Sequence, residues 1–327
     1  MKSQEKVVMI ELPQDLEPAS LEKNIKTGIK KYSVGFMKTI GLVAPTSANT
    51  NSIGGTEIAT LKSKLSESYL MAETALAEGI PENVDLLLVL SPRRLETKGL
   101  FALDQFLMRG GTVIVATSPY DITTGESLSV NEIQSGLEGW LRHNGLKVEK
   151  SMVLDESNSV FPVPVDRNIG GFVVRETKLV DYPYFVDIRE ENLLESSVVS
   201  GLDQVTLTWP SPIVVDKEDN KDRKVIRILE SSARSWSSSS IEIQPDYETY
   251  SELGFPVSLE KSKSLVGVAV EGRFRSYFEG KPHPLSEEST EGVEELNDDQ
   301  NSEIVRKVLT RSPDSSRIVL FSSNTFV

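Results

Sequence analysis

Two serines at the ends of apolar runs are the residues best placed to do chemistry in this sequence. Ser91 follows VDLLLVL and Ser118 follows TVIVAT, so each stands where a buried strand is expected to end. A serine nucleophile needs a G-x-S-x-G elbow and a histidine base. Both serines are followed by proline instead, and the only histidines are His143 and His283. Since cysteine is absent as well, we expect no catalytic residue and predict that the protein is not an enzyme.

Metal ligands and phosphate-binding loops are also poorly represented. There is no HExxH motif, and the lack of cysteine leaves carboxylates as the main metal ligands. Four alternating side chains have the spacing of calcium ligands: Asn297, Asp299, Asn301 and Glu303. The glycine on which a calcium loop turns is missing there, and no lysine follows the glycines of NSIGGTEI. We therefore predict no metal and no cofactor.

Polar residues around Ser91 and Ser118 form the candidate ligand site. In open α/β sheets, ligands bind in the crevice at the carboxyl ends of the strands. The residues expected to line this crevice are Ser91, Arg93, Ser118, Tyr120 and Asp121. Polar residues at strand ends also serve simply to end the strands, so this alternative stays open.

A second candidate surface combines aromatic and basic residues in the C-terminal half. Its members, as a candidate partner-binding patch, are Trp236, Arg273, Arg275, Tyr277 and Phe278. Tryptophan, tyrosine and arginine are enriched at the energetic centres of interfaces. Trp236 stands in SSARSWSSSS, which predicts a serine-rich loop, and the alternative for its ring is burial between the two halves of the chain. The alternative for RFRSYF is the exposed end of the preceding strand.

Helical and strand-like patterns alternate in the first half of the chain. The expected strands are Thr39–Ala44, Val84–Leu90 and Thr112–Ala116, which are apolar on both faces as in a covered parallel sheet. Helices are expected to begin at Ser20, to run from Thr56 to Leu76, to end at Arg109 and to begin at Asn131. Gly110 is expected to take the left-handed conformation that ends a helix. This order predicts an α/β fold with a doubly wound, mostly parallel sheet flanked by helices.

The pattern changes near residue 155, which divides the chain into a predicted α/β core, 1–155, and a β-rich second part, 156–327. Short strand-like pieces separated by turn signals support the second assignment. Residues 282–305 hold eight acids and neither lysine nor arginine, which predicts a solvated acidic loop. Residues 304–327 include RIVLF, a candidate to return to the first sheet. This run stands close to the last residue, so we expect the natural protein to continue.

Composition narrows the possible partners. The chain of 327 residues carries a formal net charge of −14, and such an acidic surface repels phosphate backbones, so we predict no nucleic-acid binding. The first residues lack the apolar core of a signal peptide. No run approaches the roughly 18 apolar residues that span a bilayer, so any membrane attachment would use segments absent from this sequence.

Several blocks in order resemble the auxiliary component of gliding-motility-type ABC transport systems, the Gld G-like family. The most specific is IPENVDLLLVLSPRRLETKGLFALDQFLMRGGTVIVATSPYD, residues 80–121. Further matching blocks are SLEKNIKTGIKKYS, TIGLVAPTS, LTWPSPIVVD, ESSARSW, LVGVAVEGRFRSYF and RIVLFSS. The sequence departs from the family pattern at Ser118, which stands where the family has an acid before proline.

The resemblance implies an extracytoplasmic domain, at the periplasmic or extracellular face, anchored by transmembrane segments that this sequence does not include. Its implied partners are an ABC-2 permease and its ATPase, with an exported polymer or an envelope protein as a further partner. The implied core is similar to class I glutamine amidotransferases and to a domain of an intraflagellar-transport subunit. Two alternatives stay open: a solute-binding protein with a small ligand in the strand-end crevice, and a degenerate amidotransferase-like hydrolase.

Overall fold

The structure is a computed structural model of the chain. It describes residues 37–45, 55–124, 127–169, 172–189, 201–281 and 308–325, together with a few isolated residues. Three features of the sequence analysis fall mainly or wholly outside these residues: the helix beginning at Ser20, the acidic loop 282–305 with its calcium-like spacing, and His283.

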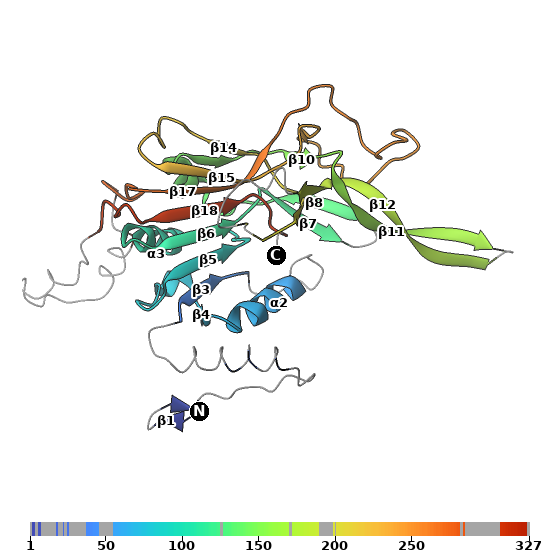
Figure 1. Cartoon of the computed structure of the whole chain (residues 1–327). Coiled ribbons are helices and arrows are strands. Elements are labelled where there is room, and N and C mark those ends of the chain that lie inside the picture. The colour runs from blue at the N-terminus through green and yellow to red at the C-terminus, as the bar shows by residue number, and fades with distance from the viewer. Residues whose placement is uncertain are drawn as a thin grey trace, which may run out of the picture.

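One large mixed sheet organises the described part of the chain (Figure 1). In spatial order its seven strands are β15 (Lys224–Glu230), β17 (Leu265–Glu271), β18 (Arg317–Phe321), β6 (Thr112–Ala116), β5 (Leu86–Leu90), β3 (Thr39–Val43) and β4 (Leu70–Glu73). The strands from β18 to β4 are parallel, whereas β17 and β15 pair antiparallel at one side. Strands from both sides of residue 155 therefore build one sheet, and β18 carries the RIVLF run.

The apolar strands predicted from the sequence bury both of their faces. In β5, Leu87 and Val89 belong to one core cluster, while Leu90 belongs to the cluster on the opposite face. Side chains of a strand alternate between the two faces, so an unbroken apolar run can serve two cores at once. This is why the central strands read as continuous hydrophobic segments.

Helices cover the two faces of the sheet unequally. On one face lie α3 (Thr97–Met108), α4 (Glu138–His143) and the pair β9 (Leu146–Val148) and β14 (Ile213–Val215). On the other face lie α2 (Gly55–Ser66) and apolar residues of β12 (Phe172–Arg189) and β13 (Gln204–Thr208). The fold is a mixed α/β structure with few helices among its described residues. The doubly wound, helix-flanked arrangement is not well supported, because strands take much of the second face.

The prediction of a single helix from Thr56 to Leu76 is wrong for the second half of that range. Helix α2 ends at Ser66, and Leu70–Glu73 then form β4, which pairs in parallel with β3. Leu76 belongs to a short 3₁₀ helix, η1 (Leu76–Glu78). Apolar residues at steps of three and four continue across this break by chance, and pairing with a distant strand overrides the local pattern.

Helix α3 ends as predicted, whereas α4 starts later than predicted. Gly110 has φ 98°, in the left-handed region, and the Gly111 N–H donates to the Phe106 carbonyl at 3.0 Å. Asn131, expected to begin a helix, lies instead in a hairpin formed by β7 (Tyr120–Thr124) and β8 (Leu128–Glu132). The helix begins only at Glu138.

The remaining strands form separate small sheets of two or three strands. Besides those already named, the strands are β10 (Met152–Leu154), which pairs with β16 (Trp236–Ser238), β11 (Asn158–Ile169), which pairs with β12, and the short pair β1 (Lys2–Ser3) and β2 (Lys6–Val7). In Figure 1 the ribbon of β11 and β12 projects from the body. Its base is the part where β13 adds a third strand, along residues 185–189. Within the described residues, no helix has the length and apolar character required to cross a membrane.

Candidate functional site

The carboxyl ends of β5, β6 and β18 meet at one edge of the main sheet, and the segments that leave these strands fill the space between them. We define this strand-end crevice by Ser91, Ser118, Tyr120, Ser211 and Asn324. The Asn324 side chain, just after β18, makes three hydrogen bonds there. Its Oδ1 accepts one from the Ser118 N–H at 3.0 Å, and its Nδ2 donates to the carbonyls of Ser118 at 3.0 Å and Tyr120 at 2.7 Å.

Both serine hydroxyls are also engaged within the crevice. The Ser91 Oγ donates to the Asn324 carbonyl at 2.6 Å. The Ser118 Oγ lies 3.4 Å from the Ser211 Oγ and accepts a hydrogen bond from the Tyr120 N–H at 3.2 Å. The structure thus brings three of the predicted ligand-site residues together, but around Asn324. Ligand binding in this crevice stays a prediction, and a ligand would have to displace the Asn324 carboxamide.

Ser91 also has an unusual backbone conformation. Its φ is 43°, in the left-handed region that few residues other than glycine adopt, and its N–H donates to the Ala116 carbonyl at 2.8 Å. Such conformations persist where the surrounding contacts fix them. At Ser91, the hydrogen bonds to the β6 backbone and to Asn324 supply these contacts.

The other predicted ligand-site residues lie at the margin of the crevice. The Arg93 Nη2 is 2.8 Å from the Asp121 Oδ2 in an ion pair that is partly exposed. The Tyr120 side chain is buried with the aromatic cluster of the second part. Burial raises the pKa of its hydroxyl; the Glu132 carboxylate raises it further, and Lys150 opposes the change. Tyr120 therefore stays neutral beyond its usual range.

Asn324 is the functional-site residue that sequence reasoning missed. It follows the RIVLF strand in SSNT, just as Ser118 follows the TVIVA strand. Once β18 is placed beside β6 in parallel, the polar residues after both strands must meet at the same edge. The available signal was therefore the polar run after RIVLF, combined with the expectation that this run returns to the first sheet.

Trp236, from the candidate partner-binding patch, is buried, with 4% of its surface exposed. Its ring belongs to a cluster that also contains Tyr182, Tyr184 and Trp209. The serines around it are partly ordered by Asp155. The Ser232 N–H and Oγ donate to the two Asp155 carboxylate oxygens at 2.6 and 2.5 Å. The segment is thus a packed turn that leads into the short strand β16, and not a free loop.

The RFRSYF segment of the same patch is fixed to α3 by a buried carboxylate. Asp104 accepts hydrogen bonds from the Ser276 Oγ at 2.6 Å, the Tyr277 N–H at 3.0 Å and the Trp140 Nε1 at 3.1 Å. Phe278 is buried, and its ring packs edge-on against that of Phe101 at 5.2 Å. The segment therefore has a rigid inner side.

The outer side of this segment carries its basic residues. Arg273 and Arg275 are exposed, and the Arg273 Nη2 lies 3.1 Å from the Asp314 Oδ2. Tyr277 is half-buried, with the Lys281 Nζ 3.1 Å from its ring centre. The Arg275 carbonyl lies 3.1 Å from the Nε2 of His143. Four of the five patch residues are thus adjacent in space, and Trp236 is in a different cluster.

His143 and the carboxylates of the described residues are the side chains that could act as a base or as metal ligands. His143 packs edge-on against Tyr277, on the segment that contacts α3 and α4, and not beside the strand-end serines. No group of three or more histidine, aspartate or glutamate side chains in the described part of the chain is arranged to hold a metal ion. The strand-end crevice is thus filled by hydrogen-bonded groups of the chain, and the partly exposed ion pair of Arg93 and Asp121 lies at its margin.

The described residues thus form a mixed α/β fold in which the chain's own side chains fill the strand-end crevice. Residues 31–327 match the family described as "ABC-type uncharacterized transport system". The chain therefore belongs to this family of auxiliary ABC-transport proteins.

Similar proteins add little beyond the family. A protein of Borreliella burgdorferi, described as "Uncharacterized protein", is 22% identical over 274 residues, covering 82% of this chain and 51% of its own length. The chain thus spans about half of this relative. The N-terminal domain of mmIFT52 aligns with a TM-score of 0.42 at 10% identity, covering 88% of this chain and 87% of that one. A ThuA-like protein from Bacteroides uniformis aligns with a TM-score of 0.38 at 13% identity, covering 71% and 76%.

Proposed function

We propose that this chain is a non-catalytic, extracytoplasmic auxiliary domain of an ABC-2-type transporter, similar to gliding-motility systems, and that it acts by binding. The observation that carries the proposal is the family match over residues 31–327. The strand-end geometry supports a binding role, because Ser91 is hydrogen-bonded to Asn324, and Ser118 is engaged by Asn324 and Ser211. The partners would be the permease, its ATPase, and an exported polymer or envelope protein.

The outer side of the RFRSYF segment is the surface we propose for a protein partner. Its backbone is held by Asp104, so Arg273 and Arg275 project from a fixed base. A preorganised surface loses little conformational freedom on association, which favours affinity. In a chain of net charge −14, the exposed Arg275, beside the Arg273–Asp314 pair, would recognise an acidic patch on the partner.

Association is tested by co-purifying the full-length protein with a candidate ABC-2 permease and its ATPase from the same genome. We expect all three to elute together from a tag on this protein. The variant Arg275→Glu should weaken the complex by about tenfold, whereas the exposed control Lys221→Glu on another loop should not. Failure of the three proteins to associate in detergent and in native membranes would contradict the proposal.

The location is tested with single cysteines, because the chain has none. Leu259 is fully exposed, so Leu259→Cys in the full-length protein should react with a membrane-impermeant maleimide on intact cells whose outer barrier is opened. Ala269→Cys is the matched control, since this position is buried and should react only after denaturation. Labelling of Leu259→Cys only after cell lysis would place the domain in the cytoplasm.

A further inference from the structure

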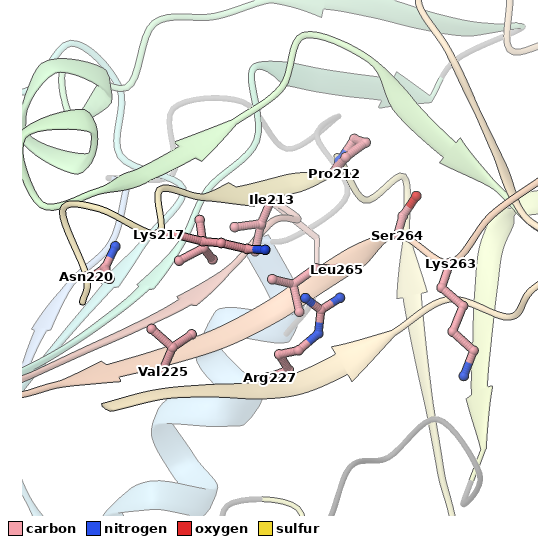
Figure 2. A pocket seen from close by; sticks show the side chains of 10 residues that line it. Pro212, Ile213, Lys217, Asn220, Val225, Arg227, Lys263, Ser264 and Leu265 are labelled. Carbon is pink, nitrogen blue, oxygen red and sulfur yellow. The ribbon is translucent and has the colours of Figure 1, made fainter. Parts of the chain in front are cut away.

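A cavity of about 580 Å³ lies between β14 and the antiparallel pair β15 and β17 (Figure 2). Its size falls within the range of roughly 300–1,000 Å³ that is usual for small-molecule sites. We call it the cationic groove and define it by the six lining residues that matter here: Ile213, Val215, Lys217, Val225, Arg227 and Leu265.

The charged residues of this groove are all positive. Lys217, Arg227 and Lys263 line it, and no aspartate or glutamate does. The whole chain has 49 acids and 35 bases, so a cavity whose charged lining residues are all cations differs from the general charge of the protein. Like charges placed together repel each other unless a counter-ion lies between them. The lining therefore favours an anion.

The two cations nearest the centre converge. Figure 2 shows the Lys217 ammonium and the terminal guanidinium nitrogens of Arg227 directed toward the middle of the groove, while Lys263 extends away from it. The Arg227 Nε pairs with the buried carboxylate of Glu230, which orients the guanidinium and balances its charge. One net positive charge, that of Lys217, therefore remains between the two groups.

The loop that carries Lys217 is held in place by a buried side chain. The Asn220 Nδ2 donates to the Gly145 carbonyl at 3.0 Å and to the Asp216 carbonyl at 2.8 Å. Asn220 is itself buried. The backbone that positions Lys217 is therefore anchored to the turn after α4, although the lysine side chain is exposed.

The floor of the groove is apolar. Ile213 and Leu265 are buried at its base, and Val225 on the edge strand β15 is 37% exposed. An apolar body lying on this floor would gain about 25 cal/mol for each Å² removed from water, which a small inorganic anion cannot gain. The groove thus combines an anion-binding centre with a surface for hydrocarbon.

We propose that the cationic groove binds an amphipathic carboxylate: a monoanionic carboxyl group on an apolar chain or ring. The carboxylate would lie between Lys217 and the terminal nitrogens of Arg227, and the apolar part would cover Ile213, Val225 and Leu265. A single negative charge matches the one net positive charge that the Glu230 pairing leaves. This site is separate from the partner surface of the proposed function.

The test is binding of octanoate, below its micelle concentration, to the purified chain. We expect the melting temperature to rise by about 4 °C at about 100 times Kd, and the affinity to fall with added salt. Acetate supplies the charge alone, octyl glucoside the apolar chain alone and octyl phosphate a second head group. Acetate and octyl glucoside should bind at least about tenfold more weakly than octanoate.

Two variants with matched controls assign the binding to the groove. Lys217→Gln should weaken octanoate binding by about tenfold, whereas Lys221→Gln on the same loop should not. Val225→Glu places a carboxylate beside the proposed anion and should weaken octanoate binding similarly. Val225→Gln introduces a side chain of the same size as glutamate but without charge, so its affinity for octanoate should stay closer to that of the parent. Equal binding of octyl glucoside and octanoate, no effect of Lys217→Gln, tighter binding of octyl phosphate, or absence of octanoate binding would each overturn the proposal.

Discussion

The strand-end crevice and the cationic groove are neighbours in the chain but differ in how their polar groups are used. Ser211 closes the crevice with its hydroxyl near that of Ser118, and the next residue, Pro212, lines the groove. In the crevice every predicted polar residue has a partner from the chain itself. In the groove, Lys217 and the outer part of Arg227 face an open cavity. A sequence pattern typical of a ligand site can thus mark residues that hold the fold together, while an open cavity is lined by residues next to them in the chain.

This contrast predicts that substitutions in the crevice act on stability and those in the groove act on binding. The largest effect is expected for Asn324→Ala, which leaves the Ser118 N–H and the carbonyls of Ser118 and Tyr120 without this partner. The loss should be about 2–4 kcal/mol in the free energy of unfolding, measured by urea denaturation. The control Asn131→Ala, exposed on β8, should change it by less than about 0.5 kcal/mol. Equal effects of the two would remove the structural role given to the crevice.

The next largest effect on stability is expected from three buried tyrosines of one aromatic cluster, Tyr120, Tyr182 and Tyr184. Burial, first of all, raises the pKa of Tyr182, Tyr184 and Tyr120 above the ordinary value of 10.0. For an acid with a raised folded pKa, the stabilisation is complete below the unfolded pKa and is lost as pH rises above it. We therefore expect stability to fall steadily as pH rises beyond about 10.

This alkaline loss is measured by following tyrosinate absorbance together with unfolding by circular dichroism. Tyr182 and Tyr184 should ionise only as the protein unfolds, while exposed tyrosines ionise earlier. Tyr120→Phe should remove one late-ionising group and reduce the pH dependence. Complete tyrosinate formation in the folded protein near pH 10 would contradict the burial of these three hydroxyls.

A smaller effect is expected at the margin of the crevice. Arg93→Gln breaks the partly exposed ion pair with Asp121 and should cost about 0.5 kcal/mol in unfolding free energy at low salt. The difference from the parent should fade at about 1 M salt, because screening weakens exposed pairs. Combining Arg93→Gln with Asp121→Asn should cost less than the sum of the two; strict additivity would show that the pair is not coupled.

The smallest stability effect belongs to the groove. Lys217→Gln should change the unfolding free energy by less than about 0.5 kcal/mol, since the side chain is exposed and its loop is anchored by Asn220. Denaturation in the absence of ligand checks this directly. A loss as large as that of Asn324→Ala would show that Lys217 holds the fold, and the two regions would no longer differ.

Much of the main sheet could be predicted because its signals are local. The strands β5 and β6 are continuous apolar runs, and α3 is followed by two glycines that end it. The strand β4 was missed for the opposite reason. Its four residues fit the helical spacing of the preceding segment, and only pairing with β3 makes them a strand. A short stretch of sequence around Leu70–Glu73 does not include β3, so it carries no signal of this pairing.

Both sites depend on contacts between distant segments, which limits prediction in different ways. The crevice joins Asn324 to Ser118 across 206 positions, and parallel pairing of two recognised strands would have suggested it. The groove has no such route. Lys217 and Arg227 come together only through the β9–β14 pairing and the antiparallel register of β15 and β17. Neither residue belongs to a motif, and a charged residue in a polar loop is ordinarily just solvated.

The projecting ribbon of β11 and β12 has a mechanical consequence. Strand residues advance by about 3.3 Å each, so the twelve residues of β11 extend roughly 40 Å. Its base is held by β13 and by Val186 and Ile188, which are buried against the main sheet. With that length, a tilt of about 10° at the base displaces the far end by roughly 7 Å. A rigid tilt of the ribbon about its base would therefore move its far end much further than the base itself.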